Sequence, residues 1–77
     1  MQNHIPRTFV GSTSFTVEGM TCNHCRHAVT TEIAAVPGVE AVAVDMTSGI
    51  VTVTSSTPVD RADIAAAVDE AGYTLRP

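Results

Sequence analysis

Residues 13–36, TSFTVEGMTCNHCRHAVTTEIAAV, change their hydrophobic period at a glycine. Up to Glu18, apolar and polar residues alternate, which is typical of a half-buried strand. From about Asn23, apolar residues recur at steps of four, four and three, which predicts one face of a helix. The stretch therefore predicts a strand, a loop opened by Gly19, and a helix that Pro37-Gly38 ends. The residues on the helical face are Cys25, Val29, Ile33 and Val36.

The rest of the chain predicts a hairpin, a second helix and a last short strand. Two alternating runs flank Thr47-Ser48-Gly49, whose residues favour a turn, so they are interpreted as a hairpin. Asp60 is a predicted N-cap, and Gly72 is a natural stop for the helix that follows it. The predicted elements are strands at 39–45, 50–54 and 73–76 and a helix from about 60 to 71, with a connector at 55–59.

This order, βαββαβ, predicts an α+β fold of the ferredoxin-like kind. Both helices would bury their apolar stripes on one face of a four-stranded antiparallel sheet. With 77 residues the chain is one domain, which we expect at 13–77 after a flexible lead-in at 1–12. The loop after the first strand and the loop before the last should share one end of the sheet, which would bring Tyr73 near the cysteines.

Charge and composition exclude several classes of function. The formal net charge is -4, lysine is absent, and the four arginines are scattered. Binding to nucleic acid or to an anionic membrane surface needs clustered basic residues, so we expect neither. No apolar run has the length of a membrane span. A protein partner should be neutral or basic at the contact, or should bind through the apolar rim of the cysteine loop.

Cys22 and Cys25 are the only two cysteines, and they form a C-x-x-C motif. Cys25 lies on the apolar stripe of the helix and should be sheltered, whereas Cys22 precedes the helix and should be more exposed. The free N–H groups of the first helical turn favour thiolate over thiol. Two thiols at this spacing can bind one soft metal ion or can form and break a disulfide, and both alternatives stay open at this point.

The N-terminus has no charged segment followed by an apolar one, as a secretory signal would. We therefore expect a cytoplasmic protein, in which a lone C-x-x-C serves a metal or redox role rather than a structural disulfide. The initial methionine and the end just after the last strand favour a free-standing protein.

Residues 19–25, GMTCNHC, resemble the G-M-T-C-x-x-C signature of the heavy-metal-associated domain family. This family includes small cytosolic copper chaperones and the N-terminal metal-binding domains of copper-transporting P-type ATPases. The resemblance covers about residues 13–76, because Val36-Pro37-Gly38-Val39, the strand at 49–53 and Ala71-Gly72-Tyr73 also agree. The tyrosine is similar to that of the bacterial chaperones.

The resemblance implies that Cys22 and Cys25 hold Cu(I) as a thiolate pair, with Met20 a core residue that does not bind metal. Soft thiolates would also accept Zn(II), Ag(I), Cd(II) or Hg(II). His24 is an auxiliary candidate, either as a third ligand or as a bridge in a metal-linked homodimer. Arg26 either lowers the cost of the paired thiolates by its positive charge or is an ordinary surface arginine. We expect His27 to be a surface residue and Met46 a turn or edge residue. The protein is expected to be a monomer without metal.

The function that follows is a soluble copper chaperone, not an enzyme. It would pass Cu(I) by ligand exchange to the metal-binding domain of a copper-transporting P-type ATPase or to a copper-responsive regulator. One alternative is the excised N-terminal metal-binding domain of such an ATPase. A mercury carrier and a dithiol/disulfide oxidoreductase are further alternatives, although the thioredoxin-type motif has a nearby tryptophan and this chain has none.

Overall fold

A computed structural model describes residues 8–20 and 23–76 of the chain. Its elements follow in the predicted order, and the predicted α+β, ferredoxin-like fold is confirmed. Their bounds are β1 Thr8–Glu18, α1 Asn23–Ala34, β2 Val39–Asp45, β3 Ile50–Asp60, α2 Arg61–Glu70 and β4 Thr74–Arg76.

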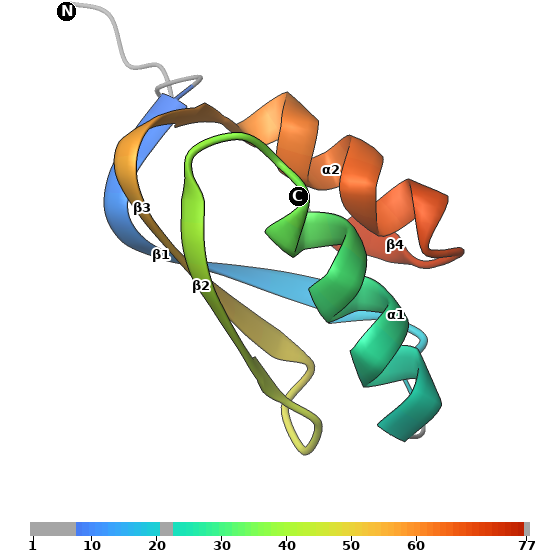
Figure 1. Cartoon of the computed structure of the whole chain (residues 1–77). Coiled ribbons are helices and arrows are strands. Elements are labelled where there is room, and N and C mark those ends of the chain that lie inside the picture. The colour runs from blue at the N-terminus through green and yellow to red at the C-terminus, as the bar shows by residue number, and fades with distance from the viewer. Residues whose placement is uncertain (1–7, 21–22, 77) are drawn as a thin grey trace, which may run out of the picture.

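The four strands form one antiparallel sheet in the order β2-β3-β1-β4. Both helices lie on the same side of this sheet, and the β2–β3 turn lies at the end where α1 begins (Figure 1). β2 and β4 are therefore the two outer strands. β4 is short and pairs only with the last part of β1, from Thr16 to Glu18.

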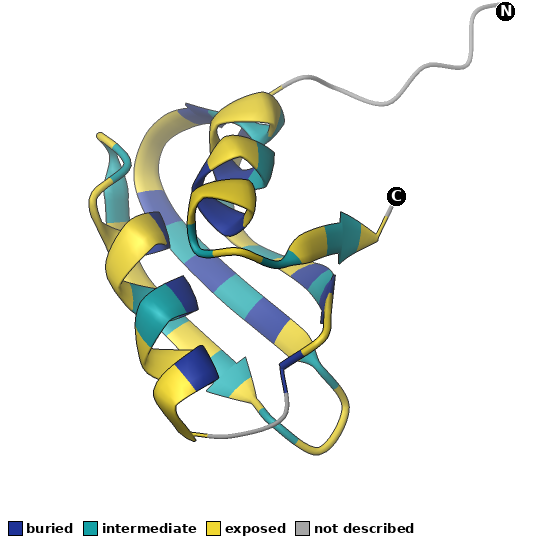
Figure 2. Ribbon diagram, turned by 90° about the vertical axis from the view of Figure 1, so that its right-hand side faces the viewer, coloured by how far each residue is buried: buried dark blue, intermediate teal, exposed yellow. Residues whose placement is uncertain are grey.

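The core lies between the sheet and the two helices. Buried residues alternate along the strands and lie on the sides of the helices that face the sheet (Figure 2). This arrangement follows from the two side-chain periods, 2.0 in strands and 3.6 in helices. The buried members of the helix stripes are Cys25, Val29 and Ile33 in α1 and Ile64, Ala67 and Val68 in α2.

The first strand begins earlier than predicted. Residues 8–12, predicted as part of a flexible lead-in, are the first five residues of β1. The predicted start is too late because a glycine such as Gly11 usually indicates the end of a strand. In the structure Gly11 lies at a β-bulge with φ 87°. The strand continues through the bulge and brings Phe9 into the core at 7% exposure. Residues 1–7 lie outside the described residues.

The third strand ends later than predicted. Residues 55–59, predicted as a connector, continue β3 as far as Asp60. The segment contains Pro58, and a proline within a strand removes a ladder hydrogen bond. However, the pairing with β2 ends at Ser55, and the segment with Pro58 is paired only with β1. Pro58 also falls within the register shift of the β1 pairing, between Gly11↔Ser55 and Phe9↔Val59, where the ladder is interrupted.

The helix ends agree closely with the sequence. The Asp60 side chain accepts a hydrogen bond from the Ala62 N–H at 2.8 Å, which confirms the predicted N-cap of α2. α1 ends at Ala34, two residues before Val36, and Val36 still packs against the core. Within the described residues, neither helix has the length and the apolar content that a membrane crossing needs.

Candidate metal centre

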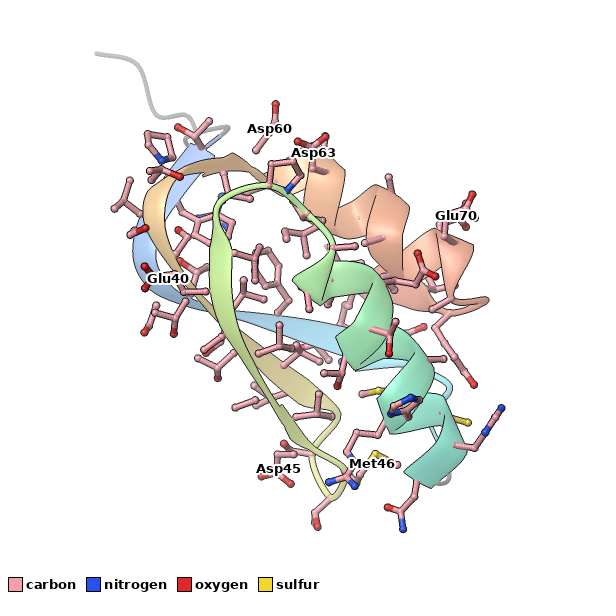
Figure 3. The ribbon with its side chains drawn as sticks, in the orientation of Figure 1. Glu40, Asp45, Met46, Asp60, Asp63 and Glu70 are labelled. Carbon is pink, nitrogen blue, oxygen red and sulfur yellow. The ribbon has the colours of Figure 1, made fainter. Side chains whose placement is uncertain are left out.

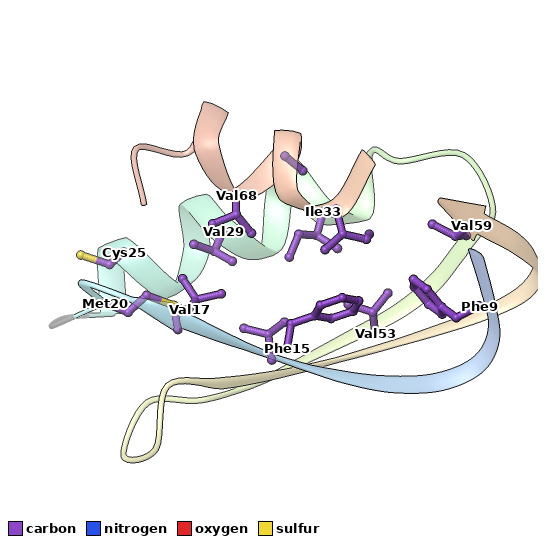
Figure 4. Packing of buried hydrophobic residues seen from close by; sticks show 13 residues of the cluster. Phe9, Phe15, Val17, Met20, Cys25, Val29, Ile33, Val53, Val59 and Val68 are labelled. Atoms are coloured by element: carbon purple, nitrogen blue, oxygen red, sulfur yellow. The ribbon is translucent and has the colours of Figure 1, made fainter. Parts of the chain in front are cut away.

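Cys25 lies in the first turn of α1 at one end of the core. It is 9% exposed and belongs to the same buried cluster as Met20 and Val29. Figure 4 shows Cys25 and Met20 at this end and Phe9 at the other. The expectation that Cys25 is sheltered is therefore confirmed, as is the core position of Met20. Cys22 lies outside the described residues.

The segment that leads to the cysteines turns at Gly19. Its φ of 95° lies in the left-handed region, which glycine adopts without strain. A methyl group built on Gly19 would lie 3.3 Å from Cδ1 of Tyr73, so the tyrosine ring lies against this turn. The backbone N–H of Tyr73 donates to the Val68 carbonyl at 3.1 Å, which fixes the tyrosine to the end of α2. The predicted approach of Tyr73 to the cysteine loop is confirmed at Gly19.

Met46 follows β2 in the turn to β3, as expected. It is half-buried and packs against the core. Figure 3 shows it at the end of the molecule where α1 begins. This packing against the core explains why an apolar residue occupies this position of the turn.

Three polar side chains of α1 surround Cys25 in sequence: His24, Arg26 and His27. All three are exposed, as expected for surface residues. Among residues 8–20 and 23–76, no three histidine, cysteine, aspartate or glutamate side chains come close enough to hold a metal ion. Binding of a metal ion by Cys22 and Cys25 therefore stays a prediction. The role of His24 as an auxiliary ligand stays a prediction.

The arginines of the described segments differ in their surroundings. Arg76 donates to Glu18 at 2.8 Å on the surface. The Arg61 guanidinium lies 5.6 Å from the Phe9 ring centre and 5.7 Å from that of Phe15. Arg26 instead lines a groove between α1 and β2, together with His27. Sequence reasoning missed this groove, because hydrophobic periodicity does not tell which strand lies at the edge of the sheet beside α1.

Comparison with known proteins identifies the family of the chain. The model of the heavy-metal-associated domain matches residues 14–74. Over 60 residues the chain is 43% identical to the copper chaperone CopZ of Bacillus subtilis (strain 168), covering 77% of this chain and 87% of that protein. It is also 38% identical over 65 residues to copper-transporting ATPase 2 of Rhizobium meliloti (strain 1021), covering 84% of this chain but 8% of the ATPase.

Solved structures agree with these relatives. A CopZ metallochaperone superposes with a TM-score of 0.80 at 29% identity, covering 84% of this chain and 98% of the other. The N-terminal domain of PacS from Synechocystis PCC6803 gives 0.75 at 31% identity, covering 84% and 92%. With a family model matching most of the chain and a relative at 43% identity, the chain belongs to the heavy-metal-associated domain family.

Proposed function

We propose that this protein carries Cu(I) on the thiolates of Cys22 and Cys25 and passes it to a protein partner by ligand exchange. The observation that carries the proposal is the position of Cys25. Its thiol lies in the first turn of α1, at the end of the core, beside the turn that Gly19 and Tyr73 form. A thiol there is held by packing, while its partner cysteine belongs to the segment before the helix.

Two thiolates suit the transfer of a soft ion. Cu(I) prefers sulfur ligands and accepts two or three of them. An incoming thiolate can therefore join the original pair before one member leaves, and the ion does not enter water. The similarity to a copper chaperone at 43% identity supports copper as the cargo, and the partner of choice is a metal-binding domain of a copper-transporting P-type ATPase. A copper-responsive regulator would use the same exchange.

A second candidate is that the chain acts as the metal-binding domain of a copper-transporting ATPase. The 38% identity to such an ATPase over 65 residues favours it, and the likeness to the PacS domain supports it. The chemistry at the thiols would be the same in both cases. The difference lies in whether the copper travels between proteins or within one, and the gene's full reading frame decides it.

The transfer itself can be tested with two purified proteins. The Cu(I)-loaded chain is mixed with the metal-binding domain of a copper-transporting ATPase, the two are separated by ion exchange, and copper is measured in each. We expect copper to reach equilibrium quickly on mixing and far more slowly when a dialysis membrane separates the proteins. Equal rates in the two arrangements would mean that copper passes through solution, which would contradict ligand exchange.

A different assay distinguishes copper transport from the alternative function, a dithiol oxidoreductase. A disulfide reductase would reduce insulin in the presence of a thiol reductant, at a rate that depends on both cysteines. We expect a rate equal to that of the Cys22→Ser variant. A rate above that of the variant would favour redox chemistry over copper transport.

A further inference from the structure

A groove of about 470 Å³ lies between α1 and the outer strand β2. One wall comes from a helix and the other from a strand, and the two walls differ in character. The helix contributes cationic and hydroxyl groups, and the strand contributes small aliphatic residues. The lining residues are Arg26, His27 and Thr30 from α1 and Val42, Ala43 and Val44 from β2.

The strand residues show that the groove runs along the edge of the sheet. Val42, Ala43 and Val44 are consecutive, and successive side chains of a strand point to opposite faces. Val42 and Val44 share one face, and the backbone of Ala43 lies between them, so the groove follows the course of the outer strand. β2 pairs with β3 and with no other strand of the described chain, so alternate N–H and C=O groups along its outer edge have no strand partner there.

The lining of the groove includes an arginine and no carboxylate, although the chain has a net charge of -4. Within residues 8–20 and 23–76, neither Arg26 nor His27 forms an ion pair. The acidic residues of β2 lie at its ends (Figure 3): Glu40 at the register shift, and Asp45 at the turn, where its side chain accepts from the Thr47 N–H at 2.9 Å. The middle of the groove therefore presents a cation beside an open strand edge.

We propose that this groove binds an extended segment of a partner protein, which adds to β2 as a fifth strand and places an acidic side chain against Arg26. Backbone hydrogen bonds to the strand edge would supply affinity, and side chains on one face of the added strand would supply specificity. The aliphatic residues of that segment would pack on Val42 and Val44. This docking surface goes beyond the copper site and does not depend on the thiols.

A second copy of the chain is a poorer occupant of this edge. Antiparallel pairing of two β2 strands about Val42 would set Glu40 of each copy opposite Val44 of the other, one residue from Asp45, so the acidic ends of the two strands would lie close together. Like charges across a strand pair are destabilising. A partner segment with an acidic residue in its middle instead meets Arg26, so charge complementarity selects a different protein.

The test uses a synthetic probe and the full chain without copper, under reducing conditions. The probe is a capped seven-residue peptide of sequence Thr-Val-Thr-Glu-Thr-Val-Thr, whose valines and glutamate share one face of a strand, titrated into isotope-labelled protein and followed by the amide NMR spectrum. We expect shifts confined to β2 and the first half of α1, and slower hydrogen exchange at alternate amides of residues 40–44. Two control peptides have lysine in place of glutamate, or N-methyl groups on alternate amides that block strand pairing.

Matched variants give the size of the effect. Arg26→Glu should lower the affinity for the glutamate peptide by about tenfold or more, because an attractive contact between arginine and glutamate becomes a repulsive one. Arg76→Glu makes the same change of charge on β4, at the opposite edge of the sheet, and should change affinity less than twofold. Thermal unfolding shows that both variants are folded.

Several results would overturn the proposal. One is a failure of the glutamate peptide to bind at millimolar concentration, and another is a control peptide that binds as tightly as the glutamate peptide. A third is a set of chemical-shift changes centred outside β2 and α1. A fourth is an equal loss of peptide affinity in Arg26→Glu and Arg76→Glu. A homodimer in sedimentation that protects β2 would also overturn it, because the edge would then be occupied by a second copy. None of these results bears on copper binding, so the proposed function is tested separately.

Discussion

At the scale of single residues, the position of the Cys25 side chain is fixed by the residues that pack around it. It belongs to the buried cluster that also holds Met20, and it stands in the first turn of α1. Burial in that cluster holds the side chain in place, so it needs little reorganisation to receive a metal ion. In the proposed copper site the fold would thus contribute a positioned ligand, and the chemistry would come from sulfur.

Tyr73 is predicted to hold the turn that leads to the cysteines. Replacing it with alanine removes the ring that lies against Gly19, which should lower the free energy of unfolding by about 2 kcal/mol and weaken Cu(I) binding. Tyr73→Phe keeps the ring and is the matched control. Urea denaturation measures the first effect, and competition with bathocuproine disulfonate measures the second. If alanine and phenylalanine behave alike, the ring does not support the turn.

His24 is predicted to act between two copies of the protein and not within one. It is exposed and lies beside Cys25, so it can reach a metal ion that two chains share. His24→Ala should reduce metal-linked dimers in analytical ultracentrifugation with copper, with little change in the affinity of the monomer. His27→Ala, an exposed histidine that follows the site, is the control. An unchanged dimer fraction in His24→Ala would remove His24 from the site.

Sequence reasoning succeeds at residues whose position follows from a period. The steps of four from Cys25 to Val29 and Ile33 correctly placed all three in the core. It could not place Arg26 against β2, because that depends on which strand lies beside α1. Net charge does not show how charges are distributed, since the acidic chain places Arg26 in the groove beside β2.

At the scale of elements, the first part of β1 is predicted to contribute to the free energy of unfolding. Phe9 packs edge-on against Phe15 with 5.5 Å between ring centres, and it is 7% exposed. Phe9→Ala should lower the free energy of unfolding by about 3 kcal/mol, because it removes a buried aromatic side chain. Val10→Ala, which changes a residue that is 60% exposed, should cost less than about 0.5 kcal/mol. Chemical denaturation that finds equal losses would mean that this part of β1 does not pack as described.

The start of α2 is predicted to depend on its cap. Asp60→Ala removes the hydrogen bond to the Ala62 N–H and should cost about 1 kcal/mol of stability. Asp69→Ala removes an exposed carboxylate from the other end of the same helix, where the dipole disfavours negative charge, and should cost nothing. The difference in denaturation midpoint between the two variants measures the cap. A midpoint for Asp60→Ala equal to that of the native chain would contradict it.

The element types and their order could be predicted from the sequence, whereas two strand ends could not. Gly11 and Pro58 are ordinary signals of a break. Both are tolerated here for reasons that only the pairing reveals: Gly11 lies at a bulge, and Pro58 lies where β3 has lost β2 as a neighbour. The Asp60 cap was predictable because it depends on local geometry alone.

At the scale of the whole molecule, the fold separates two surfaces. The cysteine end lies where α1 begins, beside the turn at Gly19, and the groove along β2 lies on the flank of the sheet. A partner segment held at β2 would leave the thiols accessible to that partner's own ligands. Mutations in β2 or at Arg26 would then change docking, and mutations of the cysteines would change metal exchange.

The central claim, that the thiolate pair carries copper, is tested most directly by titrating the chain with Cu(I) under native mass spectrometry. We predict one copper ion per chain at low loading, retained against bathocuproine disulfonate, and loss of that ion in both Cys22→Ser and Cys25→Ser. Circular dichroism shows whether each variant is folded. Copper bound equally well by the folded serine variants would contradict the account.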